Sequence, residues 1–200
     1  MATPPALLVL AGGSGQRLGG VCKADLRVNG RRLLDIVLES VPTTTCRVVV
    51  APPTVAVPQG VHQTLENPPG GGPVAGIAAG LTLLDRIAPP GTPGAPADVL
   101  VLACDMPGAP ALVPALLEGA KHRRSSTDGV VAVHPDGHRE HLALCVSRKA
   151  LFEVLHAGGH RDRSVRSVLE QLTVAPVEVP AWAADDIDEW EQWERWESRT

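Results

Sequence analysis

The residues best suited to chemistry lie near the start of the chain, in the stretch VLAGGSGQRLGG at positions 9–20 and in Lys23 just beyond it. Five glycines fall within nine residues directly after an apolar run. Glycines let a backbone approach a ligand closely and let several N–H groups point at one set of phosphate oxygens. Arg17 and Lys23 would add full positive charges there. The pattern therefore predicts a phosphate-binding loop, whose backbone would be that of Leu10, Ala11, Gly12, Gly13, Ser14 and Gly15.

Two familiar phosphate-binding motifs do not describe this loop. A P-loop requires G-x-x-x-x-G-K-[ST], but Ala24 follows the lysine here and no glycine directly precedes it. A Rossmann fingerprint requires G-x-G-x-x-G, and Leu18 stands where its third glycine would be. The loop therefore belongs to another class of phosphate-binding design.

The stretch LACDMP at 102–107 places Asp105 directly after an apolar run. If that run is a buried strand, the carboxylate lies at the carboxyl edge of the sheet. Mg²⁺ prefers one or two carboxylates together with waters and phosphate oxygens, so Asp105 is a candidate magnesium ligand. The alternative is that Asp105 caps the helix that follows.

The order of expected elements places these residues together. Apolar runs at 6–11, 47–51 and 98–103 predict buried strands, and further strands are predicted at 61–65, 129–134, 142–147 and 174–179. Helical spacing of apolar residues predicts helices over 32–41, 70–87 and 164–172, and Pro110 can begin another. Strands alternating with helices indicate an α/β fold, a Rossmann-like three-layer sandwich with a mostly parallel sheet. Such sheets bind ligands at the carboxyl ends of their strands.

Length and composition restrict the class of protein. The 200 residues suit one domain, and the formal net charge of -4 predicts neither a nucleic-acid nor a membrane partner. The four cysteines have no C-x-x-C spacing and the N-terminus has no basic region, which favours a reduced, cytoplasmic setting. Trp190, Trp193 and Trp196 repeat every three residues. We expect them to pack on the flank of the sheet or on a sister subunit, which leaves monomer and homo-oligomer both open.

The stretch LAGGSGQRLGGVCKADL at 10–26 resembles the signature of the nucleotidyltransferase superfamily, in which L-A-G-G leads through arginine, leucine and glycine to a lysine. The short gap before the lysine is similar to that of the molybdenum cofactor guanylyltransferases. The resemblance implies one nucleotidyltransferase domain over residues 1–200, of the nucleotide-diphospho-sugar transferase type. It implies a nucleotide-binding half at 1–108, an acceptor-binding half at 109–200, and GMP transfer from Mg-GTP to molybdopterin.

The same resemblance implies roles for several residues. Gly72-Pro73-Val74-Ala75-Gly76-Ile77 is similar to the family segment that packs beside the base and ribose, which assigns Gly72, Pro73 and Gly76 to the nucleotide. Arg17, Lys23 and Asp105 would be catalytic, and Asp105 would bind Mg²⁺. Asp186 and Asp188 match the two acids of a late D-x-D-T-P-E-D segment and would be further metal ligands, or else cap a helix. His141, Arg163 and Arg166 would lie near the acceptor.

The chain departs from the family pattern at positions that bear on the base. Pro52 and Pro53 stand where an asparagine is expected, and Glu66-Asn67 stands where an aspartate precedes the Gly-Pro segment, so Glu66 and Asn67 are the nucleotide-binding candidates there. Threonine and proline are missing from the late acidic segment. Three alternatives therefore remain open: CTP as donor, another phosphate acceptor (a sugar phosphate, phospholactate or methylerythritol phosphate), or a non-catalytic nucleotide-binding relative.

Overall fold

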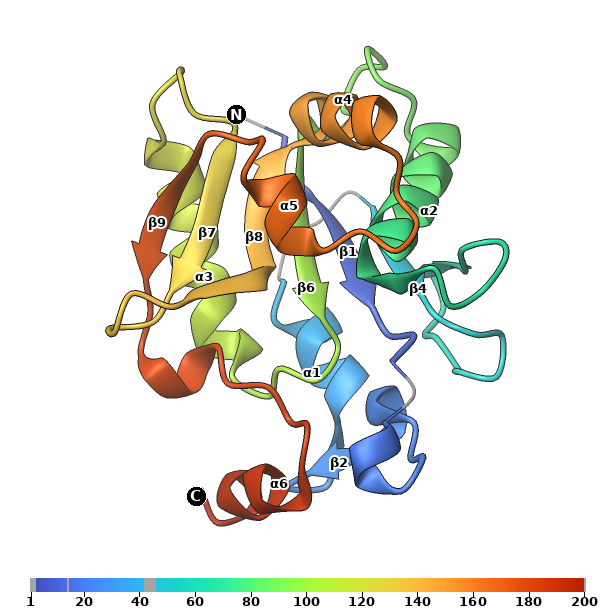
Figure 1. Ribbon diagram of the computed structural model, residues 1–200, viewed down its shortest axis with the longest axis vertical. Helices are drawn as coiled ribbons and strands as arrows, with labels where there is room; N and C mark the ends of the chain where they lie inside the picture. The colour runs from blue at the N-terminus through green and yellow to red at the C-terminus, as the bar shows by residue number, and fades with distance from the viewer. Residues whose placement is uncertain (1–2, 14, 42–45, 200) are drawn as a thin grey trace.

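Seven strands form one sheet in the computed structural model, which describes residues 3–13, 15–41 and 46–199 (Figure 1). The strand order is β5-β4-β1-β6-β8-β7-β9. Neighbouring strands are parallel except at β8, which runs antiparallel to both β6 and β7. The predicted α/β fold with a mostly parallel sheet is confirmed. The strands are β1 Ala6–Leu10, β4 Arg47–Val50, β5 His62–Thr64, β6 Asp98–Ala103, β7 Gly129–Val133, β8 Arg139–Ser147 and β9 Val174–Glu178.

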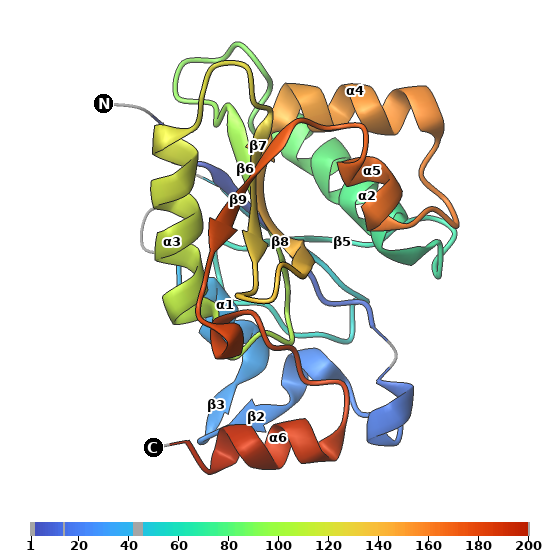
Figure 2. The ribbon, with the colours of Figure 1, turned by 60° about the vertical axis from the view of Figure 1, so that its left-hand side comes forward.

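Helices cover both faces of the sheet (Figure 2). One face carries α1 (Leu33–Glu39) and α3 (Ala109–His122), and the other carries α2 (Gly72–Ile87), α4 (Arg148–Gly158) and α5 (Val165–Leu169). Because successive side chains of a strand point to opposite faces, the continuous apolar run of β1 supplies both layers. Leu7 and Val9 join the cluster under α1 and α3, whereas Leu8 joins the cluster under α2.

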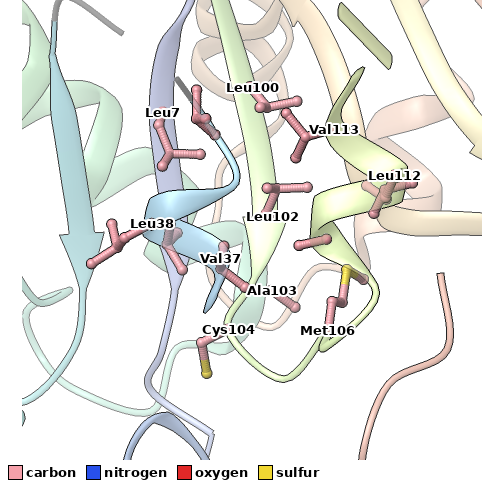
Figure 3. Packing of buried hydrophobic residues seen from close by; sticks show 14 of the residues in the cluster. Leu7, Val37, Leu38, Leu100, Leu102, Ala103, Cys104, Met106, Leu112 and Val113 are labelled. Carbon is pink, nitrogen blue, oxygen red and sulfur yellow. The ribbon is translucent and has the colours of Figure 1, made fainter. Parts of the chain in front are cut away.

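The packing of α1 and α3 on the sheet determines where the central strands end. Figure 3 shows side chains of β1 and β6 against those of α1 and α3, with Cys104 and Met106 at the lower end of this layer. Leu7, Leu100 and Leu102 are at most 1% exposed. Full burial of one such side chain is worth about 1.5–3 kcal/mol. The ends of β1 and β6 are therefore firmly placed.

A smaller region lies beyond the carboxyl edge of the sheet. The hairpin of β2 (Arg27–Val28) and β3 (Arg31–Arg32) contacts the C-terminal helix α6 (Trp190–Glu197), far away in sequence (Figure 2). Trp193 and Trp196 pack on a cluster of their own, formed by Leu18, Leu26, Val28, Leu33, Ile36 and Ile187. The expectation that these two tryptophans pack on the flank of the sheet is wrong, because they pack on this separate apolar cluster instead.

Other differences from the predicted elements have local causes. The sequence pattern did not predict β2, β3 or α4; α4 has only a narrow apolar stripe around Leu151 and Leu155. The predicted helix at 164–172 begins with Ser164 as its N-cap but ends at Leu169. Leu172 N donates to Leu169 O, so the last turn tightens to i→i+3 bonds. None of the helices among the described residues is long and apolar enough to cross a membrane.

Candidate active site

The glycine loop and Asp105 leave the sheet at the same edge. Leu10 at the end of β1 pairs with Ala103 at the end of β6, and Cys104 N donates to Leu10 O at 3.0 Å. A cavity of about 400 Å³ opens at this edge. It is lined by Leu10, Gly12, Gly13, Lys23, Val50, Glu66, Gly70, Gly72, Pro73, Gly76, Ala103, Cys104, Asp105 and Leu142.

The glycines of the loop serve two different purposes. Gly15 has a φ of +53°, and a Cβ there would lie 2.0 Å from Val21 O, so only glycine fits. Its carbonyl accepts from Leu18 N and Gly20 N, which closes the loop on itself. Gly12 and Gly13 line the cavity, and a Cβ on either would have no described protein atom within 4 Å. These two glycines therefore leave room for a ligand to approach the backbone.

Lys23 joins two carboxylates at the mouth of this cavity. Its Nζ donates to Asp105 Oδ2 at 2.7 Å and also to Asp188 Oδ1. Only 13% of the Lys23 side chain is exposed, and the same fraction of Asp105. Burial by itself lowers the pKa of Lys23, but the charges and hydrogen bonds of Asp105 and Asp188 outweigh it, so the pKa is raised. The lysine is therefore a cation over the whole physiological range.

Three carboxylates converge beside this lysine. Asp105, Asp186 and Asp188 each offer an oxygen within 4.8 Å of the other two. Burial, followed by the charges of Asp105 and Asp188, raises the pKa of Asp186. Oδ1 of Asp105 is buried and has no hydrogen-bond partner among the described residues. An orphaned oxygen in a group of carboxylates is the donor set that a hard divalent cation requires, so the residues fit Mg²⁺.

The structure argues against the capping interpretation of these acids. Helix α3 has Gly108 as its N-cap, so Asp105 does not cap it. Helix α6 has Glu189 as its N-cap, one residue after Asp188. The main chain of Asp105 instead holds the late acidic segment, because Ile187 N donates to Asp105 O at 3.0 Å. The two regions of the sequence that carry the acids are therefore in direct contact.

The Gly-Pro segment forms the opposite wall of the cavity. Gly76 packs against the sheet so closely that a Cβ would lie 3.3 Å from Leu10 Cδ2. Glu66 lines the same wall, and its Oε1 accepts from Gly70 N at 3.0 Å. The wall thus consists of a helix start with small residues and one acidic side chain.

The other predicted nucleotide residues that the structure describes lie outside the lining of this cavity. Ala11 is buried under the loop, Gly15 holds the loop closed, and Ser14 lies outside the described residues. Asn67 lines a neighbouring cavity between α2 and the end of α4. Arg17 is 72% exposed at the rim, where its Nη1 lies 3.9 Å from Asp188 Oδ2.

The three residues expected near the acceptor separate into two groups. His141 and Arg166 line a cavity of about 360 Å³ together with His138 and Arg139. Burial, followed by electrostatic interactions with His138, Arg166 and Arg139, lowers the pKa of His141. Arg163 is absent from this lining, and its guanidinium donates within the α4–α5 region, to Val154 O, Gly159 O, Ser167 Oγ and Ser167 O.

Sequence reasoning missed several residues at this edge. Val50, Ala103 and Cys104 follow the rule of carboxyl strand ends and could have been found by it. Leu142 could not, because β8 is antiparallel and brings its beginning to the edge where β6 ends. Two residues earlier, Glu140 has a pKa raised to about 7, chiefly by burial and also by the charges of Asp186, Asp105 and Asp188. The charges of these three acids therefore act on Glu140.

Comparisons with solved structures show the same overall fold in several proteins. The molybdopterin-guanine dinucleotide biosynthesis protein A of Archaeoglobus fulgidus has a similar structure, with a TM-score of 0.67 and 23% identity over 96% of each chain. A manganese complex of Rv0371c from Mycobacterium tuberculosis has a TM-score of 0.69 and 18% identity over 98% of each chain. The 2-C-methyl-D-erythritol 4-phosphate cytidylyltransferase of Thermus thermophilus has a TM-score of 0.64 and 19% identity over 96% of each chain.

Sequence comparison identifies a family for this chain but no individual curated relative. Among curated proteins, none matches the chain significantly. The MobA-like NTP transferase domain matches residues 7–177, which include the glycine loop, the Gly-Pro segment and Asp105. On this match and on the fold, the chain belongs to the family of MobA-like NTP transferases.

Proposed function

We propose that this protein transfers GMP from Mg-GTP to the terminal phosphate of a molybdopterin-type acceptor and releases pyrophosphate. The observation that carries the proposal is the convergence of Gly12, Gly13, Lys23 and Asp105 on one cavity at the carboxyl edge of the sheet. Family membership supports the transferase class, and the name of the Archaeoglobus fulgidus relative supports this donor and acceptor. In this proposal residues 1–108 bind the nucleotide and residues 109–200 bind the acceptor.

The triphosphate of the donor would lie along the glycine loop, where Gly12 and Gly13 line the cavity with open space at the position of a side chain. The base and ribose would lie against Gly72, Pro73 and Gly76, beside the carboxylate of Glu66. A carboxylate can accept hydrogen bonds from the N–H groups along one edge of guanine, which favours GTP as the donor.

Asp105, with Asp186 and Asp188, would hold the Mg²⁺ ion that neutralises charge on the phosphates. The manganese complex of the Rv0371c relative supports a divalent cation in this fold. Lys23 lies between two of these carboxylates, so its ammonium is already at the place where phosphate charge would accumulate.

The chemistry needs no general base. An oxygen of the acceptor's phosphate, already an anion, attacks the α-phosphorus of GTP; a new P–O bond forms as the bond to pyrophosphate breaks. The protein then contributes position and charge neutralisation. Lys23 and the loop N–H groups stabilise the negative charge that moves to the leaving group. Arg17, exposed at the rim, can add a bidentate contact to the same phosphates.

The acceptor would approach from the side of β8. Arg166 and Arg139 provide positive charge in the neighbouring cavity, which His141 also lines, and Leu142, the next residue of β8, lines the nucleotide cavity. Arg163 is occupied by its contacts to main-chain carbonyls, so we assign it an indirect role of holding the segment before α5.

The test is pyrophosphate release by the purified protein with GTP, CTP, ATP and UTP in turn, each with Mg²⁺ and molybdopterin. Release that requires GTP and molybdopterin together supports the proposal, and EDTA should abolish it. Release with CTP and molybdopterin would change the donor. Release only with a sugar phosphate, phospholactate or methylerythritol phosphate would change the acceptor. Binding of GTP without turnover on any acceptor would identify a non-catalytic relative.

A further inference from the structure

The late acidic segment has no regular structure of its own. Residues 184–189 form neither helix nor strand, yet Asp186 and Asp188 reach the same point as Asp105. A carboxylate on irregular backbone keeps its direction only if neighbouring groups hold that backbone. The contacts of this segment therefore decide whether the group of three carboxylates exists.

One anchor lies between the two acids. Ile187 is fully buried in the cluster that Trp193 and Trp196 cover, and its N–H donates to Asp105 O. This contact fixes the middle of the segment. It leaves the backbone after Ile187, where Asp188 begins, without a bond to the sheet.

The second anchor is the side chain of Gln192. Its Oε1 accepts from the backbone N–H of Asp188 at 2.7 Å and from that of Glu189 at 2.7 Å. Gln192 is the third residue of α6, so this is the reach of a capping-box side chain back to the residues before the helix. One amide oxygen thus holds two consecutive peptide groups, and the first of them belongs to Asp188.

Helix α6 is itself attached to the nucleotide-binding half. Trp193 Nε1 donates to Arg27 O at 2.7 Å, and Asn29 N donates to Glu197 Oε1 at 2.8 Å. Gln192 is therefore part of a rigid unit that includes the β2–β3 hairpin. A chain of direct contacts runs from this hairpin through α6 and Gln192 to Asp188 and then to Lys23.

We infer that Gln192 is a positioning residue, which directs the carboxylate of Asp188 to the cation held with Asp105. The inference rests on the proposed function, because it presupposes that these acids bind a divalent cation. Groups that orient metal ligands typically change metal affinity by about 10–100-fold when they are removed. Asp188 is 41% exposed and shares the site with two other acids, so we expect the lower end, about tenfold.

The experiment measures Mn²⁺ affinity of the intact protein directly, by calorimetric or paramagnetic-resonance titration, and needs no turnover. Gln192→Ala removes both hydrogen bonds. Gln192→Glu keeps an acceptor oxygen at the same reach and is the other usual capping-box residue. Glu194→Ala is the matched control, an exposed substitution on the same helix. Thermal unfolding of all four proteins shows that each is folded at the titration temperature.

The inference predicts weaker Mn²⁺ binding by about tenfold in Gln192→Ala, recovery to near wild-type affinity in Gln192→Glu, and no change in Glu194→Ala. Equal affinity of wild type and Gln192→Ala would overturn the inference alone and would leave Gln192 as a helix cap. A loss in Gln192→Ala that Gln192→Glu does not restore would also overturn it. Absence of Mn²⁺ binding by the wild type would overturn the proposed function as well.

Discussion

Asp105 and Asp188 both contact the ammonium of Lys23, but the protein places them by different means. Asp105 follows a buried central strand whose register with β1 is set by backbone hydrogen bonds, and it is 13% exposed. Asp188 lies on irregular backbone, is 41% exposed, and depends on Ile187 and Gln192 for its position. Asp105 is therefore positioned by the sheet, whereas Asp188 is positioned by contacts with the C-terminal helix α6.

The largest effect should come from substitution of Asp105, the acid that follows strand β6. Asp105→Asn keeps the shape of the side chain but removes the charge, and with it a charged partner of Lys23 and, in the proposed function, a cation ligand. We expect pyrophosphate release to fall by about 10³-fold, the upper range for loss of one electrostatic group. Metal-dependent GTP binding should weaken in parallel. An unchanged dependence of turnover on Mg²⁺ would show that Asp105 does not act through a cation.

Lys23→Ala should have the next largest effect. In the proposed function the variant loses a cation that stabilises the leaving phosphates, so the rate should fall by about 10²–10³-fold. Affinity for Mn²⁺ in the absence of nucleotide should not fall, because the ammonium no longer competes for Asp105 and Asp188. Steady-state kinetics and Mn²⁺ titration together test this. Wild-type turnover would refute the assigned role.

Glu140→Gln tests a fourth acid, on which the charges of Asp105, Asp186 and Asp188 act. Its pKa of about 7 lies above the ordinary 4.5, so the folded state binds the proton more tightly than the unfolded state. The wild type should therefore lose stability as pH rises towards and through 7, by at most about 3 kcal/mol at 1.36 kcal/mol per pH unit. Denaturant unfolding between pH 5 and 8, in EDTA, should show a flatter profile for Glu140→Gln. Parallel profiles would contradict the burial of a charge there.

Asp188→Asn should have the smallest effect of the four. A half-exposed carboxylate interacts through a higher effective dielectric than a buried one, so its contribution to holding a cation is weaker. We expect a loss of Mn²⁺ affinity of about tenfold, comparable to that of removing its orienting partner. If Asp188→Asn lowered the Mn²⁺ affinity as much as Asp105→Asn does, the two acids would contribute equally. The proposed difference between an acid positioned by the sheet and one positioned by α6 would then be wrong.

The predictable part of the fold follows from local chemistry. The apolar runs that became β1, β4 and β6 need burial on both faces, and only a sheet covered by helices provides it. Pro73 in the first turn of α2 and Ser164 before α5 marked helix starts correctly, because they satisfy or avoid orphan N–H groups. The hairpin of β2 and β3 is too short to leave a pattern, and its partner α6 lies about 160 residues later.

The site residues that could be predicted are likewise those that follow parallel strands, because the carboxyl ends of these strands meet at one edge of the sheet. That rule placed the glycine loop beside Asp105, and the structure has both around one cavity. It could not place Leu142 or Glu140, which come from the start of an antiparallel strand. Nor could it choose between cation binding and helix capping for Asp186 and Asp188, since both uses require acids before a helix.

What the amino-acid order determined by itself is the α/β architecture and the glycine loop with its two cations, because hydrophobic periodicity and backbone freedom are local properties. Only the tertiary structure decided that the late acids meet Asp105 and Lys23. That meeting depends on Ile187 and the tryptophans of α6 finding an apolar cluster more than 150 residues away in the chain. Burial against a distant surface leaves no periodic signal in the sequence, so its outcome is visible only in the folded molecule.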